Sequence, residues 1–600
     1  MDGKGGGTLS HPGIRIESSF DGATIWGRIS CDGTGVAAGR EFPVRSRYDP
    51  GVPGNEGIAM PNITGKLLGL CVTASVVTCG ISDAVGDTQI TCVVVDAETG
   101  EPLPCRVYLE SSDGEFHFVE SADPNGSAVR YDVARSPTSL EKHTTVSAHA
   151  FTQTLPAGDY KLRIERGKEY HPAELAIELG DSPVDQTVEL KRWINVAERG
   201  WYSGDTHVHR TLDELPNVML AEDLNVALPL SYWVRDAYTP PSQGDKSTAV
   251  TGELITVDDT HVIWPMNTEY EIFTVNGQRH TLGAVFVLNH RQPLTPAAPP
   301  VAPIAAVARD QGAILDLDKH SWPWSMMLLP VMDVDLFELS NNHVWRTEFF
   351  FKQWTIDQLP AEWQIQTDAD GFTEWGWIDF GFKTYYSLLN CGFRMRPTGG
   401  TASGVHPVPL GFGRVYVHLP DGFSYDAWMD GLNAGRSFVT TGPMLFAEFS
   451  GKQPGTTITA QSGDSVQVAG TVESSRPLNR IEILRNGMVV EILHPSLVAG
   501  ENGGYLSSFD RQVRVDGTSW IAVRAFEGEP GHERIRFAHS APLFIDVSDR
   551  PLHPKPHEIQ FLVNRMELEI ERNRGVISDD ELAEYRQALD VYRRMAEQAE

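Results

Sequence analysis

The sequence has little of several features that would set its class at once. Six cysteines in 600 residues, none of them in a CxxC pair, exclude a disulfide-dense scaffold. The 49 basic residues face 80 acidic ones, and the net charge of −31 argues against nucleic acid as a partner. The apolar run 67–81 is short for crossing a bilayer, so the chain is not expected to span a membrane. Because no nucleophile-elbow, dinucleotide-fold or P-loop motif occurs, serine hydrolase chemistry and nucleotide cofactors are disfavoured.

Two of the cysteines flank a turn signal. Cys92 and Cys105 stand symmetrically about residues 98–101, so a hairpin turning there would place them opposite one another. A disulfide would then form in an oxidising compartment. Two buried free thiols are the alternative.

The first 84 residues differ from the rest of the chain. Residues 1–59 are rich in Gly, Pro and Arg without a period of 2 or 3.6, which indicates a disordered extension or a mis-assigned start. Residues 60–84 have a short basic start at Lys66, the apolar run, and a small-residue cleavage site at Ser82–Ala84. This pattern predicts a signal peptide and an exported protein cleaved near Ala84. A buried strand pair is the alternative.

The remaining chain is too long for one core and predicts several domains. Alternating apolar residues within 85–195 and again within 446–548 predict two β-sandwiches, the second of them Ig-like. Between them, 196–445 has continuous apolar runs, which suit strands buried on both faces of a parallel sheet or barrel. A capping box at 578–581 before an apolar stripe predicts a helical hairpin within 549–600.

Side chains able to bind a metal recur where these central apolar runs end. They are His290, His320, Glu338 and His406. In α/β barrels the carboxyl ends of the strands converge on one face, where active sites are built. His207 and His209 form the strongest local element, because two imidazoles two residues apart on an extended segment point the same way.

The central region resembles the CehA/McbA metallohydrolases, a branch of the polymerase and histidinol phosphatase (PHP) superfamily. The opening motif of that family is similar to Gly204–His209, and its closing motif is similar to Gly435–Pro443. The resemblance implies a distorted seven-stranded α/β barrel that binds zinc, manganese or iron and hydrolyses esters or phosphoesters. Residues 85–195 likewise resemble the transthyretin-like domains beside many secreted enzymes.

The resemblance also implies a set of site residues. The implied ligands are His207, His209, Glu271, His280, His320 and His406, and the further or substitute ligands are Glu269, His290, Glu338 and His343. Asp205 is expected to orient a ligand imidazole, with a turn cap as the alternative. The chain departs from the family at Ser231–Trp233 and Thr401–His406, where an Asp and a His are missing, which favours one or two ions.

Other residues near these motifs suit substrate binding. Arg394 and Arg396 are predicted to clamp an anion, or else to neutralise nearby acids. The tryptophans expected to stack on a sugar or aromatic group, or else to pack in the core, are Trp322, Trp324 and Trp345. The sequence therefore predicts a metal-dependent hydrolase of a small-molecule or carbohydrate-derived substrate. A non-catalytic carbohydrate-binding scaffold and a metal-dependent lyase or sugar-modifying enzyme are the alternatives.

Overall fold

The computed structural model describes residues 86–243, 250–353, 358–496, 498–500, 502–528 and 534–600, and four strands nearer the N-terminus. The chain divides into two units, Met1–Ser82 and Asp83–Glu600. The first contains a four-stranded sheet in the order β1 (Thr8–His11), β2 (Ile14–Asp21), β3 (Thr24–Cys31) and β4 (Pro43–Val44). These strands lie in a stretch for which the sequence indicates no regular period. The expected signal segment 60–84 lies outside the described residues.

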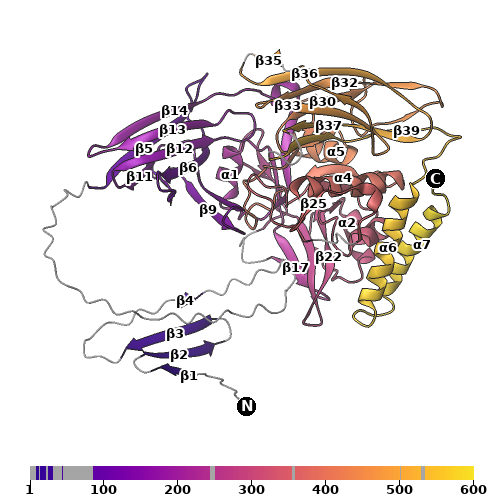
Figure 1. Cartoon of the computed structure of the whole chain (residues 1–600), viewed down its shortest axis with the longest axis horizontal. Coiled ribbons are helices and arrows are strands. Elements are labelled where there is room, and N and C mark those ends of the chain that lie inside the picture. The colour runs from indigo at the N-terminus through magenta and orange to yellow at the C-terminus, as the bar shows by residue number, and fades with distance from the viewer. Residues whose placement is uncertain are drawn as a thin grey trace. The chain divides into compact units, whose positions relative to one another are not determined.

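Residues 88–190 form two sheets that share one core (Figure 1). One sheet has the order β13 (Ala173–Leu179), β12 (Gly158–Glu165), β6 (Cys105–Ser111), β10 (Leu140–Val146) and β9 (Ala128–Ala134), with β7 (Phe116–His117) beside β6. The other has the order β14 (Val184–Leu190), β5 (Thr88–Asp96), β11 (Phe151–Leu155) and β8 (Glu120–Ser121). Side chains alternate between buried and exposed along β13 and β14, as expected for sheets with one solvated face.

The two cysteines of this sandwich are free and buried. Cys92 lies on β5 and Cys105 on β6, and these strands belong to different sheets. The predicted turn forms, since Val95 pairs antiparallel with Pro102 and the Leu103 N–H donates to the Val94 carbonyl, but beyond it β5 and β6 enter different sheets. The pair therefore corresponds to the alternative of two buried free thiols. Burial raises the pKa of the Cys92 thiol to about 12.

A seven-stranded sheet lies at the centre of the second unit. Its order is β18 (Ser242–Gln243), β17 (Tyr232–Asp236), β21 (Thr268–Val275), β22 (Gln278–Leu288), β23 (Ile314–Leu317), β24 (Leu336–Ser340) and β27 (Arg396–Gly399). β22 runs antiparallel to both of its neighbours, whereas β23, β24 and β27 are parallel. The helices that contact this sheet include α2 (Ala302–Asp310), α3 (Ser325–Met332), α4 (Glu374–Asn390) and α5 (Tyr425–Ala434).

The register of this sheet places several acids on one face. Glu269 is paired with Phe286, and Phe286 with Asp316. Because successive side chains alternate between faces, Glu271 and Asp318 share the face of Glu269 and Asp316. All of these acids are buried, so this face carries polar chemistry instead of ordinary core packing.

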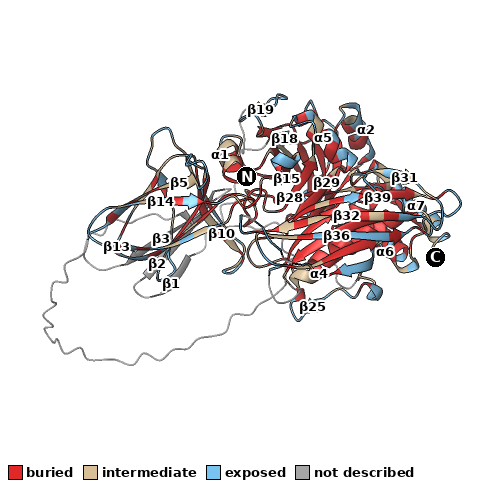
Figure 2. Ribbon diagram, turned by 90° about the horizontal axis from the view of Figure 1, so that it is seen from above, coloured by how far each residue is buried: buried red, intermediate tan, exposed pale blue. Residues whose placement is uncertain are grey.

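A twelve-stranded sheet joins the central region to the C-terminal one (Figure 2). Its main path is β19 (Ile255–Thr256), β20 (Val262–Ile263), β16 (Val226–Pro229), β15 (Trp201–Val208), β28 (Arg414–His418), β29 (Ser437–Thr440), β38 (Arg536–Ser540), β37 (Ser519–Glu527), β33 (Leu478–Arg485) and β34 (Met488–Leu493). β39 (Leu543–Asp546) pairs with β37 and with β31 (Thr457–Thr459). The predicted second sandwich therefore shares one of its sheets with the centre, because β29 pairs with β38.

The remaining elements complete the layers. A four-stranded sheet, β30 (Met444–Phe449), β32 (Ser465–Ser474), β36 (Tyr505–Arg514) and β35 (Val498–Ala499), covers the C-terminal core. The short elements are α1 (Leu215–Ala221), α5 (Tyr425–Ala434), the 3-10 helices Ala197–Arg199 and Ala361–Trp363, and the hairpin of β25 (Thr367–Asp368) with β26 (Gly371–Phe372). Among the described strands no pairing closes either large sheet on itself, so the centre is two open sheets and not the expected closed barrel.

The C-terminal hairpin consists of α6 (Pro556–Asn573) and α7 (Leu582–Ala596). The predicted capping box forms, since the backbone N–H of Ser578 donates to Glu581 at 2.6 Å and that of Glu581 donates to the Ser578 hydroxyl. Tyr585 and Tyr592 are buried in the main core, so the hairpin belongs to the body of the protein. None of the helices in the described ranges is long and apolar enough to cross a membrane.

Candidate metal centre

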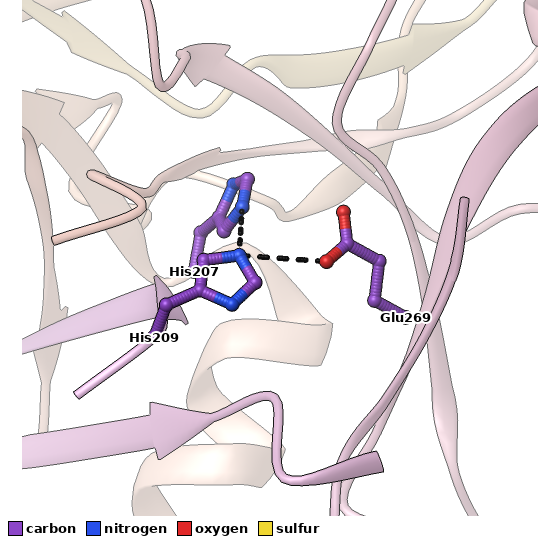
Figure 3. A group of neighbouring side chains, drawn as sticks. All are labelled: His207, His209 and Glu269. Atoms are coloured by element: carbon purple, nitrogen blue, oxygen red, sulfur yellow. Dashed lines mark hydrogen bonds and ion pairs between the residues drawn. The ribbon is translucent and has the colours of Figure 1, made fainter. Parts of the chain in front are cut away.

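Two imidazoles meet at the end of β15. All eight residues of this strand are buried, because sheet partners lie on both of its edges. His207 lies on the strand and His209 just beyond it, and their Nε2 atoms are 3.2 Å apart (Figure 3). The predicted convergence of this pair is present in the structure, and it places two nitrogen ligands within reach of one ion.

Carboxylates from the opposite sheet approach the two imidazoles. Glu269 Oε2 lies 3.4 Å from His209 Nε2 (Figure 3), and Glu338 Oε2 lies 3.0 Å from His207 Nδ1. Two groups have ligand atoms within 4.8 Å of one another, namely His207 with His209 and Glu269, and His207 with Asp318 and Glu338. The centre therefore joins the end of β15 to β21, β23 and β24.

A lysine lies among the acids of this centre. Lys319 Nζ is 2.9 Å from Glu269, 3.0 Å from Glu271 and 2.5 Å from Asp318. Burial opposes its charge, but Asp318, Glu269 and Glu271 together raise the pKa of Lys319 well above its usual value. This ammonium is thus a fixed positive charge inside the centre.

The donor set fits a divalent metal ion. Four buried carboxylate oxygens have no hydrogen-bond partner among the described residues: Glu269 Oε2, Asp316 Oδ1, Asp318 Oδ1 and Glu338 Oε1. A buried charged oxygen without a partner is costly unless a cation binds it. Imidazole nitrogen with carboxylate oxygen is a combination that zinc, manganese and iron accept.

The electrostatics of the centre agree with that fit. Burial, followed by His209 and Lys319, lowers the pKa of His207 far below its usual value, which keeps the imidazole in the neutral form that binds metals. Burial and then Glu269 raise the pKa of Glu271 to about 8. The carboxylates are crowded, so a bound cation would relieve their repulsion.

Asp205 holds the chain at this point. Its carboxylate accepts from the backbone N–H groups of His207, Thr401 and Gly411, and from the Thr401 hydroxyl at 2.5 Å. None of these four bonds comes from an imidazole ring, so the contacts are those of the turn-cap alternative and not of the expected orienting role. Asp205 fixes His207 by ordering the backbone at the end of β15.

Three further predicted histidines lie beside the centre in an aromatic pocket. The rings of His343 and His406 are 5.6 Å apart, and Trp345 lies 5.5 Å from His406. His320 packs on Trp377 at 5.2 Å, and its Nε2 has no hydrogen-bond partner in the described part of the chain. Their ligand atoms belong to neither close group, so their roles as metal ligands stay predictions.

Two other predicted histidines lie elsewhere. His290 shares hydrogen bonds with Thr268 at 2.8 Å and with the Gln292 carbonyl at 2.9 Å. Because β22 runs antiparallel to its neighbours, its carboxyl end lies beside the amino ends of β21 and β23. His280 lies near the turn before β22 and contacts Asn573 of α6 at 2.8 Å. Of the two competing acid positions, Glu269 and not Glu271 approaches a histidine.

The residues predicted to bind substrate make ion pairs with nearby acids or pack in the core. Arg394 pairs with Asp546 of the C-terminal region, and Arg396 lies 3.7 Å from Asp335. The Trp324 indole donates to the Tyr585 hydroxyl at 2.7 Å, anchoring α7 to the core. All three tryptophans expected to stack on substrate are at least nine-tenths buried, which is the core-packing alternative.

Sequence reasoning missed several residues that belong to the site. Asp318 and Lys319 lie between the end of β23 and His320. Their place directly after an apolar run is the sequence signal that could have identified them as site residues. Trp233, in the departure from the family pattern, lies 6.0 Å from the His209 ring. Arg135, from the turn between β9 and β10, is 3.5 Å from His406 Nδ1. No local pattern signals Arg135, because it comes from the N-terminal sandwich.

Comparisons with known proteins add little to this geometry. No family model matches the chain, and no curated protein matches it. Similar solved structures include a two-domain protein from Bacteroides vulgatus ATCC 8482 described as containing a predicted PHP-like metal-dependent phosphoesterase, with 9% identity, a TM-score of 0.26, and coverage of 54% of this chain and 90% of that one. A streptococcal ancillary pilin has 13% identity, a TM-score of 0.12, and coverage of 47% and 72%. Both scores are too low to establish a common fold.

Proposed function

We propose that this protein is a metal-dependent hydrolase that acts on an ester or phosphoester bond. The observation that carries the proposal is the buried group of His207, His209 and Glu269, whose ligand atoms lie within 4.8 Å of one another. The motifs at Gly204–His209 and Gly435–Pro443 support placing it among CehA/McbA-like enzymes of the PHP superfamily. The metal would be zinc, manganese or iron.

Different residues of this site would have different roles in binding the ion. His207, His209 and Glu269 would hold the ion, and Asp318 is the next carboxylate in reach. If the Nδ1–H of His207 donates to Glu338, its Nε2 keeps the lone pair that a metal requires. A divalent ion held by these residues would lower the pKa of a water molecule to about 7 and would polarise the bond to be hydrolysed.

No observation favours the carbohydrate-binding alternative. That alternative uses the sandwiches and the tryptophans to hold a polysaccharide, and Trp322, Trp324 and Trp345 are buried. The lyase alternative uses the same metal ligands. The reaction products distinguish a lyase from a hydrolase, because only hydrolysis places solvent oxygen in a product. Reaction in labelled water followed by mass spectrometry of both products makes that distinction.

The first test is elemental analysis of purified protein beside the His207→Ala/His209→Ala variant. We expect about one or two equivalents of zinc, manganese or iron in the wild type and loss of the metal in the variant. His290→Ala is the matched control, because this buried histidine belongs to neither close group and should leave the metal content unchanged.

Activity is tested on the metal-loaded protein with panels of carboxylic esters, phosphomonoesters and phosphodiesters. Hydrolysis that disappears in the double variant and persists in His290→Ala supports the proposal. Negligible metal in the wild type after reconstitution with each of the three ions would refute it.

A further inference from the structure

Lys319 lies where a cation is needed. Its side chain is buried, with 6% of the residue exposed, and its ammonium is surrounded by Asp318, Glu269 and Glu271 at 2.5 to 3.0 Å. These are the acids that would otherwise repel one another beside the two imidazoles. The lysine lies one residue after Asp318, a member of one of the close groups, so the chain itself delivers a positive charge into the centre.

The contacts leave this ammonium no capacity for another partner. A protonated lysine has three N–H donors, and three carboxylate oxygens lie within hydrogen-bonding range. A lysine that bound a substrate anion or moved a proton would need a donor directed at the substrate. Lys319 is therefore committed to the acids of the centre.

Two of the acids, Glu269 and Asp318, each contact the lysine through only one carboxylate oxygen. Glu269 gives Oε1 to Lys319 and directs Oε2 toward His209, and Oε2 has no hydrogen-bond partner in the described residues. Asp318 gives Oδ2 to Lys319, and its Oδ1 is likewise without a partner there. Each acid thus has one oxygen held by the ammonium and one left for an ion.

We propose that the Lys319 ammonium takes the place of a second cation, so that the centre holds a single divalent ion bound by His207, His209 and Glu269. This inference rests on the proposed function, because it requires that the centre bind metal. It narrows the expected one or two ions to one. It also assigns Lys319 as a positioning residue, which acts on substrate only through the acids that it holds.

Metal stoichiometry tests the inference without any assay of activity. Wild-type protein reconstituted with excess Mn²⁺ and freed of unbound ion should hold about one equivalent. Lys319→Met removes the charge but keeps an unbranched side chain, and it should hold about two. Lys319→Arg keeps the charge and should hold about one. Lys168→Met is the control, because Lys168 is a half-buried lysine outside the centre whose ammonium donates to the Thr441 carbonyl at 2.8 Å.

A spectroscopic measurement keeps the test independent of how the variants fold. Electron paramagnetic resonance of the Mn²⁺-loaded wild type should show an uncoupled mononuclear signal at saturation. An exchange-coupled spectrum or two equivalents in the wild type would overturn the inference while leaving the proposed function intact. One equivalent in a folded Lys319→Met protein would also overturn it. No metal in the wild type would remove the proposed function itself, and the inference with it.

Discussion

At the scale of single residues, Asp205 shows how a conspicuous acid can serve the backbone. Its carboxylate satisfies three backbone N–H groups and one hydroxyl around the metal centre. The motif that contains it predicts the two histidines correctly, because residues two apart on a strand share a side. The same alternation cannot separate Glu269 from Glu271, which also lie two apart on one strand.

Replacing Asp205 by Ala should destabilise the protein without removing the ligands. The four donors would lose their buried acceptor, and the expected cost is about 2–4 kcal/mol of unfolding free energy. Asp205→Asn, which keeps an acceptor oxygen, should cost less. Urea denaturation measures both, and elemental analysis should still find metal in Asp205→Asn. Complete loss of metal from a stable Asp205→Asn protein would contradict the structural role.

Gly400 is the residue whose substitution should most directly disturb the centre. A Cβ at this position would lie 2.3 Å from His207 Cβ and 3.0 Å from the carboxyl carbon of Glu338. Gly400→Ala should therefore move His207 and weaken metal binding more than tenfold, with a loss of about 1–3 kcal/mol in stability. Gly180→Ala is the control, since nothing lies within 4 Å of its Cβ. Competition with a chromophoric chelator measures the affinities, and equal affinities in the two variants would show that Gly400 has no such role.

At the scale of elements, the local sequence pattern predicted several strands and the start of a helix. The apolar runs predicted β16, β22, β23 and β24, and the capping box predicted the start of α7. The direction of β22 had no local signal, since an apolar run reads the same in either orientation. That one reversal is why His290, at the end of β22, lies away from the site although it follows a strand as His320 does.

The contact between α4 and β38 should make stability depend on pH. The Tyr386 hydroxyl on α4 donates to His539 Nε2 at 2.8 Å, and His539 Nδ1 donates to the Ser540 carbonyl. Burial, with a contribution from Arg524, lowers the pKa of His539 to about 3, whereas an unfolded histidine has a pKa of about 6.5. The unfolded state therefore binds the extra proton between these values. The stabilisation is complete above pH 6.5 and is lost as the pH falls toward 3.

Comparison with His539→Gln isolates this contribution. Between pH 6 and pH 4 the wild type should lose about 1.4 kcal/mol more per pH unit than the variant, because one proton is linked to unfolding. Urea denaturation at a series of pH values gives the difference. Parallel curves for the two proteins would show that His539 does not titrate as expected.

At the scale of the whole molecule, the N-terminal sandwich is tied to the centre by buried charges. Arg106 on β6 pairs with Glu165 of the same sandwich at 2.5 Å and with Glu222, which follows α1. Tyr131 and Arg135 of this sandwich reach the backbone around His406. Contacts of this kind join residues far apart in the sequence, so neither composition nor period could predict them.

Breaking the Arg106 cluster should be costly. Arg106→Met leaves Glu165 and Glu222 buried without their shared partner, and the expected loss is about 3–5 kcal/mol of unfolding free energy. Arg130→Met is the matched control on β9 of the same sheet. Its pair with Asp132 is exposed and should be worth less than about 1 kcal/mol. Urea denaturation compares the two, and similar midpoints would show that the buried cluster contributes no more than the exposed pair.

The pairing of β29 with β38 limits where recombination could replace the C-terminal region with that of another protein. A crossover placed after residue 445, at the boundary that the sequence suggests, would leave β29 with a bare edge and the incoming segment with nowhere to attach. Any donor sequence would have to supply a strand that pairs with Ser437–Thr440 in the same register. The region after β29 would therefore be inherited with the candidate metal centre as one piece. The N-terminal sandwich has its own two sheets, and no strand crosses from it at residues 191–200, so a crossover there would leave both parts intact.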